Sequence, residues 1–137
     1  MNIPGVYPHE YAPLLAVWVE GGHHMSRWSA WTVHCTQEEE SLLLRHTEGF
    51  FPPFQTTECK LAAATFAGII ERLEMISVPL VAEPHVVVTD GSFVGMAYNS
   101  SVSFRWYSVA PKEWEPLAHW HGETTNIFDR VLQGELS

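Results

Sequence analysis

The chain has 137 residues, of which 46% are hydrophobic and 17% charged, a composition typical of one globular domain and not of a disordered chain. Its formal net charge of −9 argues against binding to nucleic acid and favours either simple solubility or a basic partner. The longest apolar run, Leu61 to Ile70, is too short to cross a membrane, and no signal-peptide pattern precedes Arg27. We therefore expect a cytoplasmic protein.

The first part of the chain predicts three strands after an extended entry segment. Three prolines favour extended backbone over residues 1–13. Alternating side chains then predict strands at 15–20, 29–36 and 42–48. In the second of these strands one face would carry Trp31, Val33 and Cys35, and the other Thr32, His34 and Thr36.

A first helix is predicted over residues 57–76. Thr57 is a good N-cap residue, and Glu58 would lie in the first turn, where the helix dipole favours a carboxylate. Pro79 limits any continuation of the helix. Apolar residues at spacings of three and four form one stripe, made of Ala62, Phe66, Ile69, Leu73 and Ile76.

Asp90-Gly91 gives the strongest local signal in the chain. Alternating runs on both sides of this dipeptide, at 85–89 and 92–98, predict a β-hairpin with a type I′ turn. A turn at 99–101 then leads to a further strand at 102–108, in which Val102, Phe104 and Trp106 share one face.

The tail of the chain is predicted to be helical. One helix would begin at Pro111 and end at Gly122, and Asn126 with Asp129 would cap a short last helix. Three strands and a helix, followed by three strands and one or two helices, suggest a βββα duplication. We therefore expect residues 1–137 to form a single α+β domain, with an antiparallel sheet of about six strands and helices on one face.

The segment HWHGE, residues 119–123, raises the question of a metal site. In a helix, His119 and His121 lie roughly 200° apart around the axis, so they point to different sides. His23 and His24 follow two glycines, but the sequence identifies no third ligand for them. We therefore expect neither a metal nor another cofactor.

Cys59 is the candidate nucleophile. In the first turn of the predicted helix, the helix dipole would lower its thiol pKa, although no partner histidine is identified. Cys35 would be a buried thiol, because its neighbour His34 points to the other face of the strand. A small enzyme, or a ligand- or metal-binding protein, that uses Cys59 or a histidine cluster is therefore one hypothesis for the function.

Two segments are candidates for contact with a protein partner. An acidic run at the turn after the second strand is either a solvated loop or an acidic contact surface for a basic partner. A glycine-flanked loop before that strand is either fixed to the sheet, a hot spot for a partner, or part of an oligomer interface. The candidate contact residues are Arg27, Trp28, Glu38, Glu39, Glu40, His23 and His24.

Several segments together resemble a pattern in small, uncharacterised bacterial proteins. In chain order they are SRWSAWTV, LLLR, VVVTDGSF, PKEWEPL and IFDRVL. The small, acidic, Trp-rich α+β profile is also similar to that of immunity proteins, which neutralise bacterial toxins. This resemblance implies a non-enzymatic protein-binding module that occludes a toxin's active site, with no nucleic-acid or membrane partner.

Overall fold

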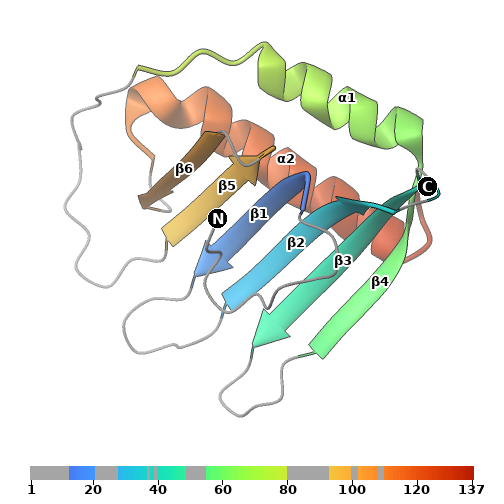
Figure 1. The fold of residues 1–137 in the computed structure, drawn as a ribbon. Helices are drawn as coiled ribbons and strands as arrows, with labels where there is room; N and C mark the ends of the chain where they lie inside the picture. Colours follow the sequence, from blue (N-terminus) through green and yellow to red (C-terminus); the bar gives the residue numbers. More distant parts are fainter. Residues whose placement is uncertain are drawn as a thin grey trace.

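The structure is a computed structural model that describes residues 13–20, 28–36, 38, 40–48, 55–79, 93–99, 102–107 and 110–137. Its strands are β1 (Leu15–Glu20), β2 (Trp28–Cys35), β3 (Ser41–Glu48), β4 (Gln55–Leu61), β5 (Phe93–Tyr98) and β6 (Val102–Tyr107). Its helices are α1 (Ala63–Glu74), the short 3-10 helix η1 (Lys112–Trp114) and α2 (Glu115–Leu132). The described strands form one antiparallel sheet in the order β4-β3-β2-β1-β5-β6 (Figure 1).

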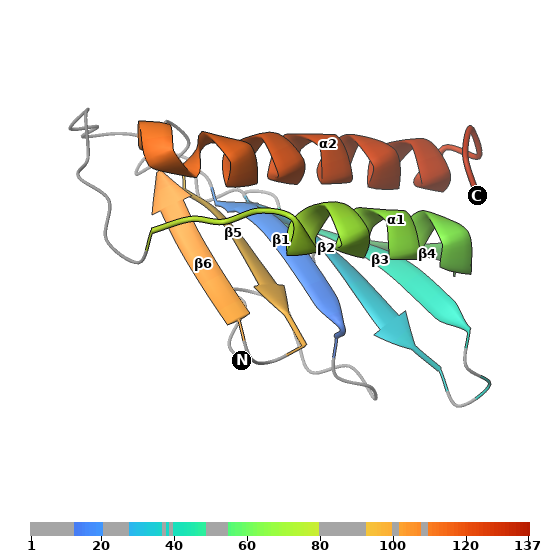
Figure 2. The same ribbon diagram turned by 90° about the horizontal axis from the view of Figure 1, so that it is seen from above.

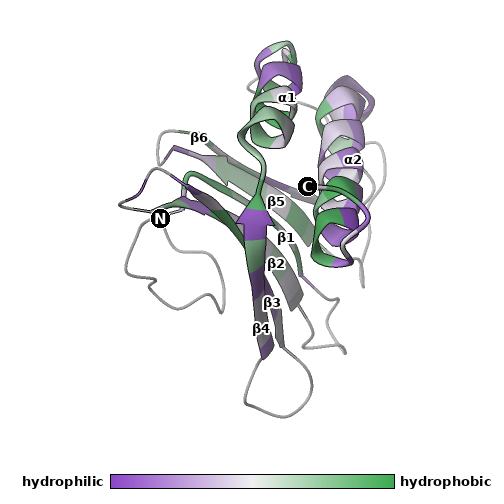
Figure 3. Ribbon diagram, turned by 90° about the vertical axis from the view of Figure 1, so that its right-hand side faces the viewer, coloured by the Kyte–Doolittle hydropathy of each residue, from purple (hydrophilic) through white to green (hydrophobic). Residues whose placement is uncertain are grey.

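Both helices lie on the same face of this sheet, where they run side by side across the strands (Figures 2 and 3). The predicted α+β class, with an antiparallel sheet of six strands and helices on one face, is thus confirmed. In the described part of the chain, no helix is long and apolar enough to cross a membrane.

The main core lies between the sheet and the two helices. Strand alternation sends every second side chain of β1, β2, β3, β5 and β6 to this face, where α2 contributes a buried stripe. The buried members of this core are Leu15, Val17, Trp31, Val33, Leu43, Leu61, Ile69, Met96, Trp106, Leu117, Trp120, Phe128 and Val131.

Two tryptophans of this core carry hydrogen bonds that join elements far apart in the sequence. The indole Nε1 of Trp31, on β2, donates to Asp129 Oδ1 on α2 at 2.9 Å. The indole Nε1 of Trp120, on α2, donates to the backbone carbonyl of Ile69 on α1 at 3.0 Å. Because both N–H groups are satisfied, these large rings are buried at little polar cost.

On the opposite face of the sheet, Trp18 lies across β5 at Gly95. A Cβ atom at Gly95 would overlap the indole ring of Trp18, so only glycine leaves room for this ring. The Trp18 Nε1 donates to Glu20, at 3.1 Å, and the Arg105 Nε donates to the same carboxylate at 2.8 Å. The Arg105 guanidinium in turn lies over the ring of Phe93.

The predicted start of the first helix is wrong. Thr57 and Glu58 belong to β4, which pairs with β3, and α1 begins only at Ala63. Pairing with β3 and burial of Leu61 outweigh the local capping signal, since tertiary contacts routinely override such propensities. The predicted apolar stripe is confirmed for Phe66, Ile69 and Leu73, which lie in α1 and belong to the main core. Ala62 and Ile76 lie outside the helix, and of these two only Ile76 packs against the core.

The turn at Asp90-Gly91 and the first strand of the predicted hairpin, at 85–89, fall outside the described residues, whereas its second strand corresponds to β5. Residues 80–92 lie outside the described part of the chain, but Phe93–Tyr98 pairs along its full length with β1 on one side and with β6 on the other. Both edges of β5 are therefore paired within the described sheet. The predicted strand after the turn, at Val102–Tyr107, is confirmed as β6.

The predicted helix end at Gly122 is also wrong. A single helix, α2, runs from Glu115 to Leu132, so the predicted cap at Asn126 lies inside it. Gly122 is on the exposed side, and the buried stripe continues past it to Phe128. The described elements are four strands and α1, then two strands and α2, so the βββα duplication is not confirmed.

Replacing a glycine by alanine should have opposite effects on stability at Gly95, on β5, and at Gly122, on α2. Gly95→Ala is expected to lower the free energy of unfolding by about 2 kcal/mol or more, because the Trp18 ring must move. Gly122→Ala, with nothing within 4 Å of the added Cβ, is expected to raise it by about 0.5–1 kcal/mol. Chemical denaturation measures both values. Destabilisation by Gly122→Ala would contradict a continuous α2.

Candidate binding site

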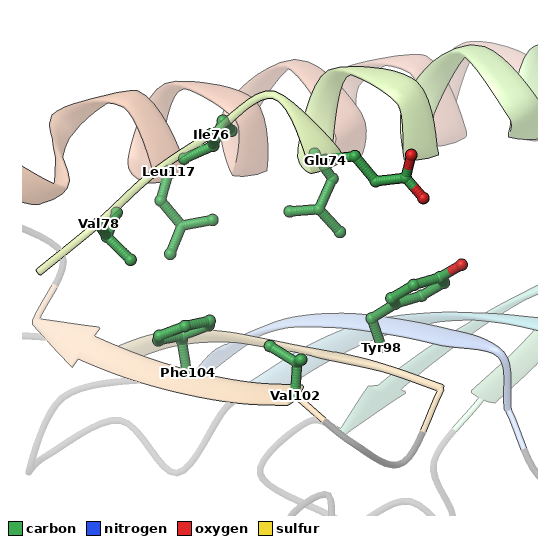
Figure 4. A pocket seen from close by; sticks show the side chains of 8 residues that line it. Glu74, Ile76, Val78, Tyr98, Val102, Phe104 and Leu117 are labelled. Atoms are coloured by element: carbon green, nitrogen blue, oxygen red, sulfur yellow. The ribbon is translucent and has the colours of Figure 1, made fainter. Parts of the chain in front are cut away.

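An apolar cavity of about 220 Å³ lies between the end of α1, the segment after it and the β5–β6 hairpin (Figure 4). A cavity of roughly 150 Å³ is enough to hold a benzene ring, whereas sites for drug-sized ligands begin at roughly 300 Å³. This cavity therefore has room for one aromatic or branched aliphatic side chain. Its lining residues are Leu73, Glu74, Ile76, Val78, Tyr98, Val102, Phe104 and Leu117.

The cavity exists because the chain leaves α1 in an extended conformation. After the helix ends at Glu74, residues 76–79 run as extended chain toward the β6 side of the molecule (Figure 2). Below them, Val102 and Phe104 point toward the helices from alternate positions of β6, and Leu117 of α2 closes the interior (Figure 4). Four separate parts of the chain thus supply an almost wholly apolar lining.

The mouth of the cavity combines polar and exposed apolar groups. Glu74 and the Tyr98 hydroxyl lie at the same end of the cavity (Figure 4). Met75, between two lining residues, is 85% exposed, and Val102 is 41% exposed. Large apolar side chains this exposed are uncommon among the described residues, and two of the three that occur, with Leu136 as the third, are at this site. Val102 lines the cavity itself, and Met75 lies between the lining residues Glu74 and Ile76 in the sequence.

An aromatic cluster supports one wall of the cavity. The ring of Phe104 meets that of Trp114 edge-on at 5.5 Å, and Trp106 meets both Trp114 and His121 edge-on. The indole N–H groups of Trp106 and Trp114 are buried without a hydrogen-bond partner in the described part of the chain. Close packing of aromatic edges and faces fixes the position of Phe104.

His121 anchors α2 beside this cluster. Its Nε2 lies 3.1 Å from both the Trp18 and the Gly95 carbonyl oxygens, so a single Nε2–H donates to two adjacent strands. Burial lowers the pKa of His121 below its ordinary value, while the hydrogen bonds to Trp18 and Gly95 act in the opposite direction. Burial at this position therefore favours the neutral imidazole.

A second polar network lies on the face of the sheet opposite the helices. The Thr32 hydroxyl lies 2.9 Å from His34 Nε2 and 3.0 Å from His46 Nε2. The other ring nitrogen of His46 is 3.4 Å from the Thr56 hydroxyl. A hydroxyl has only one proton to donate, so with both rings neutral one of these Nε2 atoms must itself be a donor. The network therefore restricts the tautomers that the two buried histidines can adopt together.

Those predicted partner-binding residues that the structure describes fall into two groups that the fold separates. Glu38 and Glu40 are exposed at the turn after β2, whereas Trp28 begins β2 at its other end. An eight-residue strand holds its ends roughly 23 Å apart, so these groups do not form one patch. The structure does not describe Arg27, His23, His24, Glu39 or the side chain of Trp28.

The acidic turn does lie at the same end of the sheet as the cavity. In the register of the sheet, Val33 and Leu43 are level with Tyr98 and Val102, which flank the β5–β6 turn. Cys35 and Ser41, which flank the acidic turn, lie two residues beyond this level at the same end. Three strand spacings, or roughly 14 Å, separate the two turns. One partner is therefore able to contact both sites.

The chemical hypothesis for Cys59 loses its basis. Cys59 lies in the middle of β4, not in the first turn of a helix, and burial raises the pKa of its thiol. A raised pKa leaves less reactive thiolate at neutral pH. Cys35 is half-buried, and its Sγ donates to the Thr36 carbonyl.

The prediction that His119 and His121 point to different sides is confirmed. His119 is exposed and lies 2.8 Å from Glu123, while His121 is buried against the sheet. Among the described residues, no group of three potential metal ligands is found. His34 and His46 are brought close through Thr32, which the sequence did not indicate.

Most of the tryptophans belong to the core. Among the described side chains, Trp18, Trp31, Trp106 and Trp120 are buried and Trp114 is half-buried. The high tryptophan content therefore reflects packing for these five residues. It is not by itself an argument for a binding surface.

The cavity residues could not be identified from the sequence as a group. The sequence predicts that Val102 and Phe104 share a strand face and that Leu73 lies on the apolar stripe of a helix, and both placements are confirmed. That these faces enclose a cavity depends on the pairing of β5 with β1 and on the path after α1. Neither of these leaves a local signal.

Comparison with known protein families, curated proteins and solved structures finds no match for this chain. The function is therefore inferred from the geometry of the cavity and its surroundings. The resemblance to immunity proteins stays a hypothesis.

The lowered pKa of His121 predicts how stability depends on pH. Because the unfolded chain takes up the proton at a higher pH, the full contribution is present above about pH 6.5 and is lost as pH falls through the folded-state pKa. His121→Gln keeps an N–H donor but removes this titration. In urea unfolding at pH 7.5 and pH 5.5, wild type should lose more stability than the variant. Equal losses would contradict this role.

Proposed function

We propose that the protein is a non-enzymatic protein-binding module, and that its partner inserts an apolar side chain into the cavity between α1 and the β5–β6 hairpin. The observation that carries this proposal is the cavity itself, apolar and open beside exposed Met75 and Val102. Cavities that accept one anchoring side chain are typical of binding hot spots.

The size of the site favours a side chain of a larger partner over a free ligand. The cavity volume of about 220 Å³ suits a single ring or branched chain. Val102 lines the cavity but is also 41% exposed, so a small molecule inside the cavity would leave part of this apolar side chain uncovered. Exposed apolar surface around a hollow is typical of protein interaction sites.

The charge of the chain favours a basic partner. The net charge is −9, Glu74 lies at the mouth of the cavity, and Glu38 and Glu40 are exposed at the same end of the sheet. Complementary charge would steer a basic partner to this end and raise the association rate. The site thus suits a partner segment in which one apolar side chain, which would enter the cavity, is flanked by Lys or Arg.

The most specific form of the proposal is an immunity-type inhibitor. It would bind a bacterial toxin with a basic surface and cover the toxin's active site. The acidic composition and the resemblance to immunity proteins support this form, and the cavity would supply the anchoring contact. Trp28, which begins β2 at the other end of the sheet, would then lie outside the anchor site.

Substitution of Val102 tests the cavity directly. We expect Val102→Lys to reduce affinity for a partner captured from native lysate at least tenfold, or about 1.4 kcal/mol, because it places a charge in the apolar lining of the cavity. Val102 is 41% exposed, so the fold should be retained. Titration calorimetry with the purified partner measures the change.

Leu136→Lys is the matched control, because Leu136 is 38% exposed and does not line this cavity. It should leave the affinity unchanged. Equal affinity for both variants and wild type would remove the cavity from the interface.

Charge reversal identifies which end of the sheet binds. Glu38→Lys combined with Glu40→Lys should slow association and reduce its dependence on salt, because both side chains are exposed at the cavity end. Trp28→Ala alters the opposite end of β2. Surface plasmon resonance at two salt concentrations measures both effects. Weaker binding by Trp28→Ala alone would move the interface to that end.

A further inference from the structure

We infer that β4 is a self-association edge, along which two copies of the chain pair antiparallel about a two-fold axis at Cys59. In the described sheet, β4 pairs with β3 only and forms one edge (Figure 1). Its seven residues stay in register with β3 without a bulge. A regular edge strand presents a row of backbone N–H and C=O groups to another strand. This inference does not rest on the proposed function.

The charges of β4 are complementary to themselves. Glu58 and Lys60 flank Cys59 and lie on the face opposite the helices, because Cys59 packs against the main core. In an antiparallel pair centred on Cys59, Glu58 of each copy lies opposite Lys60 of the other. The symmetry of the dimer makes this attraction occur twice.

Neighbouring registers lack this complementarity. A pair centred on Glu58 would place two Glu58 carboxylates opposite each other, and a pair centred on Lys60 would do the same with two ammonium groups. Like charges directly opposite each other destabilise a strand pair. Charge therefore selects the register centred on Cys59.

The residues of β4 are available for this contact. Five side chains of the strand are exposed, namely Gln55, Thr56, Thr57, Glu58 and Lys60. The Nζ of Lys60 lies 3.5 Å from Glu40, but both groups are exposed, so this ion pair is weak and exchange of partners costs little. On the other edge strand, Arg105 is already bound to Glu20 by two hydrogen bonds. Of the two edge strands, β4 is therefore the one whose charged side chains can more easily pair with a second copy.

Charge exchange across the two-fold axis tests the inference. Sedimentation equilibrium of the full chain, with a reducing agent present, should show a reversible wild-type dimer. Glu58→Lys and Lys60→Glu should each weaken the dimer about tenfold or more, because both symmetric pairs become like-charged. The double variant, Glu58→Lys with Lys60→Glu, should restore it.

Glu40→Gln is the control, because it removes the Lys60 contact within one chain but leaves β4 unchanged. Its dimer should match that of wild type. Circular dichroism confirms that each variant is folded, and all substituted side chains are exposed. A monomeric wild type, unweakened single variants, or a double variant no stronger than the single ones would each overturn the inference.

Discussion

The hydrogen bonds from His121 to the carbonyls of Trp18 and Gly95 fix α2 against the middle of the sheet. Other contacts of the fold depend on this position, because a helix is rigid along its length. One turn before His121, Leu117 reaches the cavity, and two turns after it Asp129 receives the indole N–H of Trp31. Apolar contacts alone would allow several positions of α2 on the sheet. The buried imidazole is hydrogen-bonded to both carbonyl oxygens in only one of them.

The cavity follows from the way the helices cover the sheet. α2 lies against the sheet and is joined to α1 through the Trp120 indole and the Ile69 carbonyl. Past Glu74 the chain is extended, so it covers the β5–β6 hairpin with single side chains such as Ile76 and Val78. A thin cover of this kind leaves unfilled apolar volume. Unfilled volume costs stability, which is consistent with a site that is completed when a partner binds.

Local patterns predict most of the strands, and long-range contacts explain what they miss. The alternation around Trp31 and Phe104 predicts β2 and β6 because one strand face is buried, and this signal is local. Thr57 is misleading because its capping potential is outweighed by pairing with Arg45 on β3. Gly122 is misleading because the buried stripe of α2 continues past it. The sequence predicts the separate faces that line the cavity. It does not predict that they enclose a cavity, because this depends on the order of the strands in the sheet.

Hydrogen–deuterium exchange of the complex with a captured partner tests the binding account most directly. The account predicts that residues 73–79, 98–99 and 102–104 gain protection on binding, since these segments supply most of the cavity wall. The start of β2, at Trp28, should exchange as in the free protein. Protection confined to the start of β2, with unchanged exchange around Val102 and Leu73, would contradict the account and place the interface at the other end of the sheet.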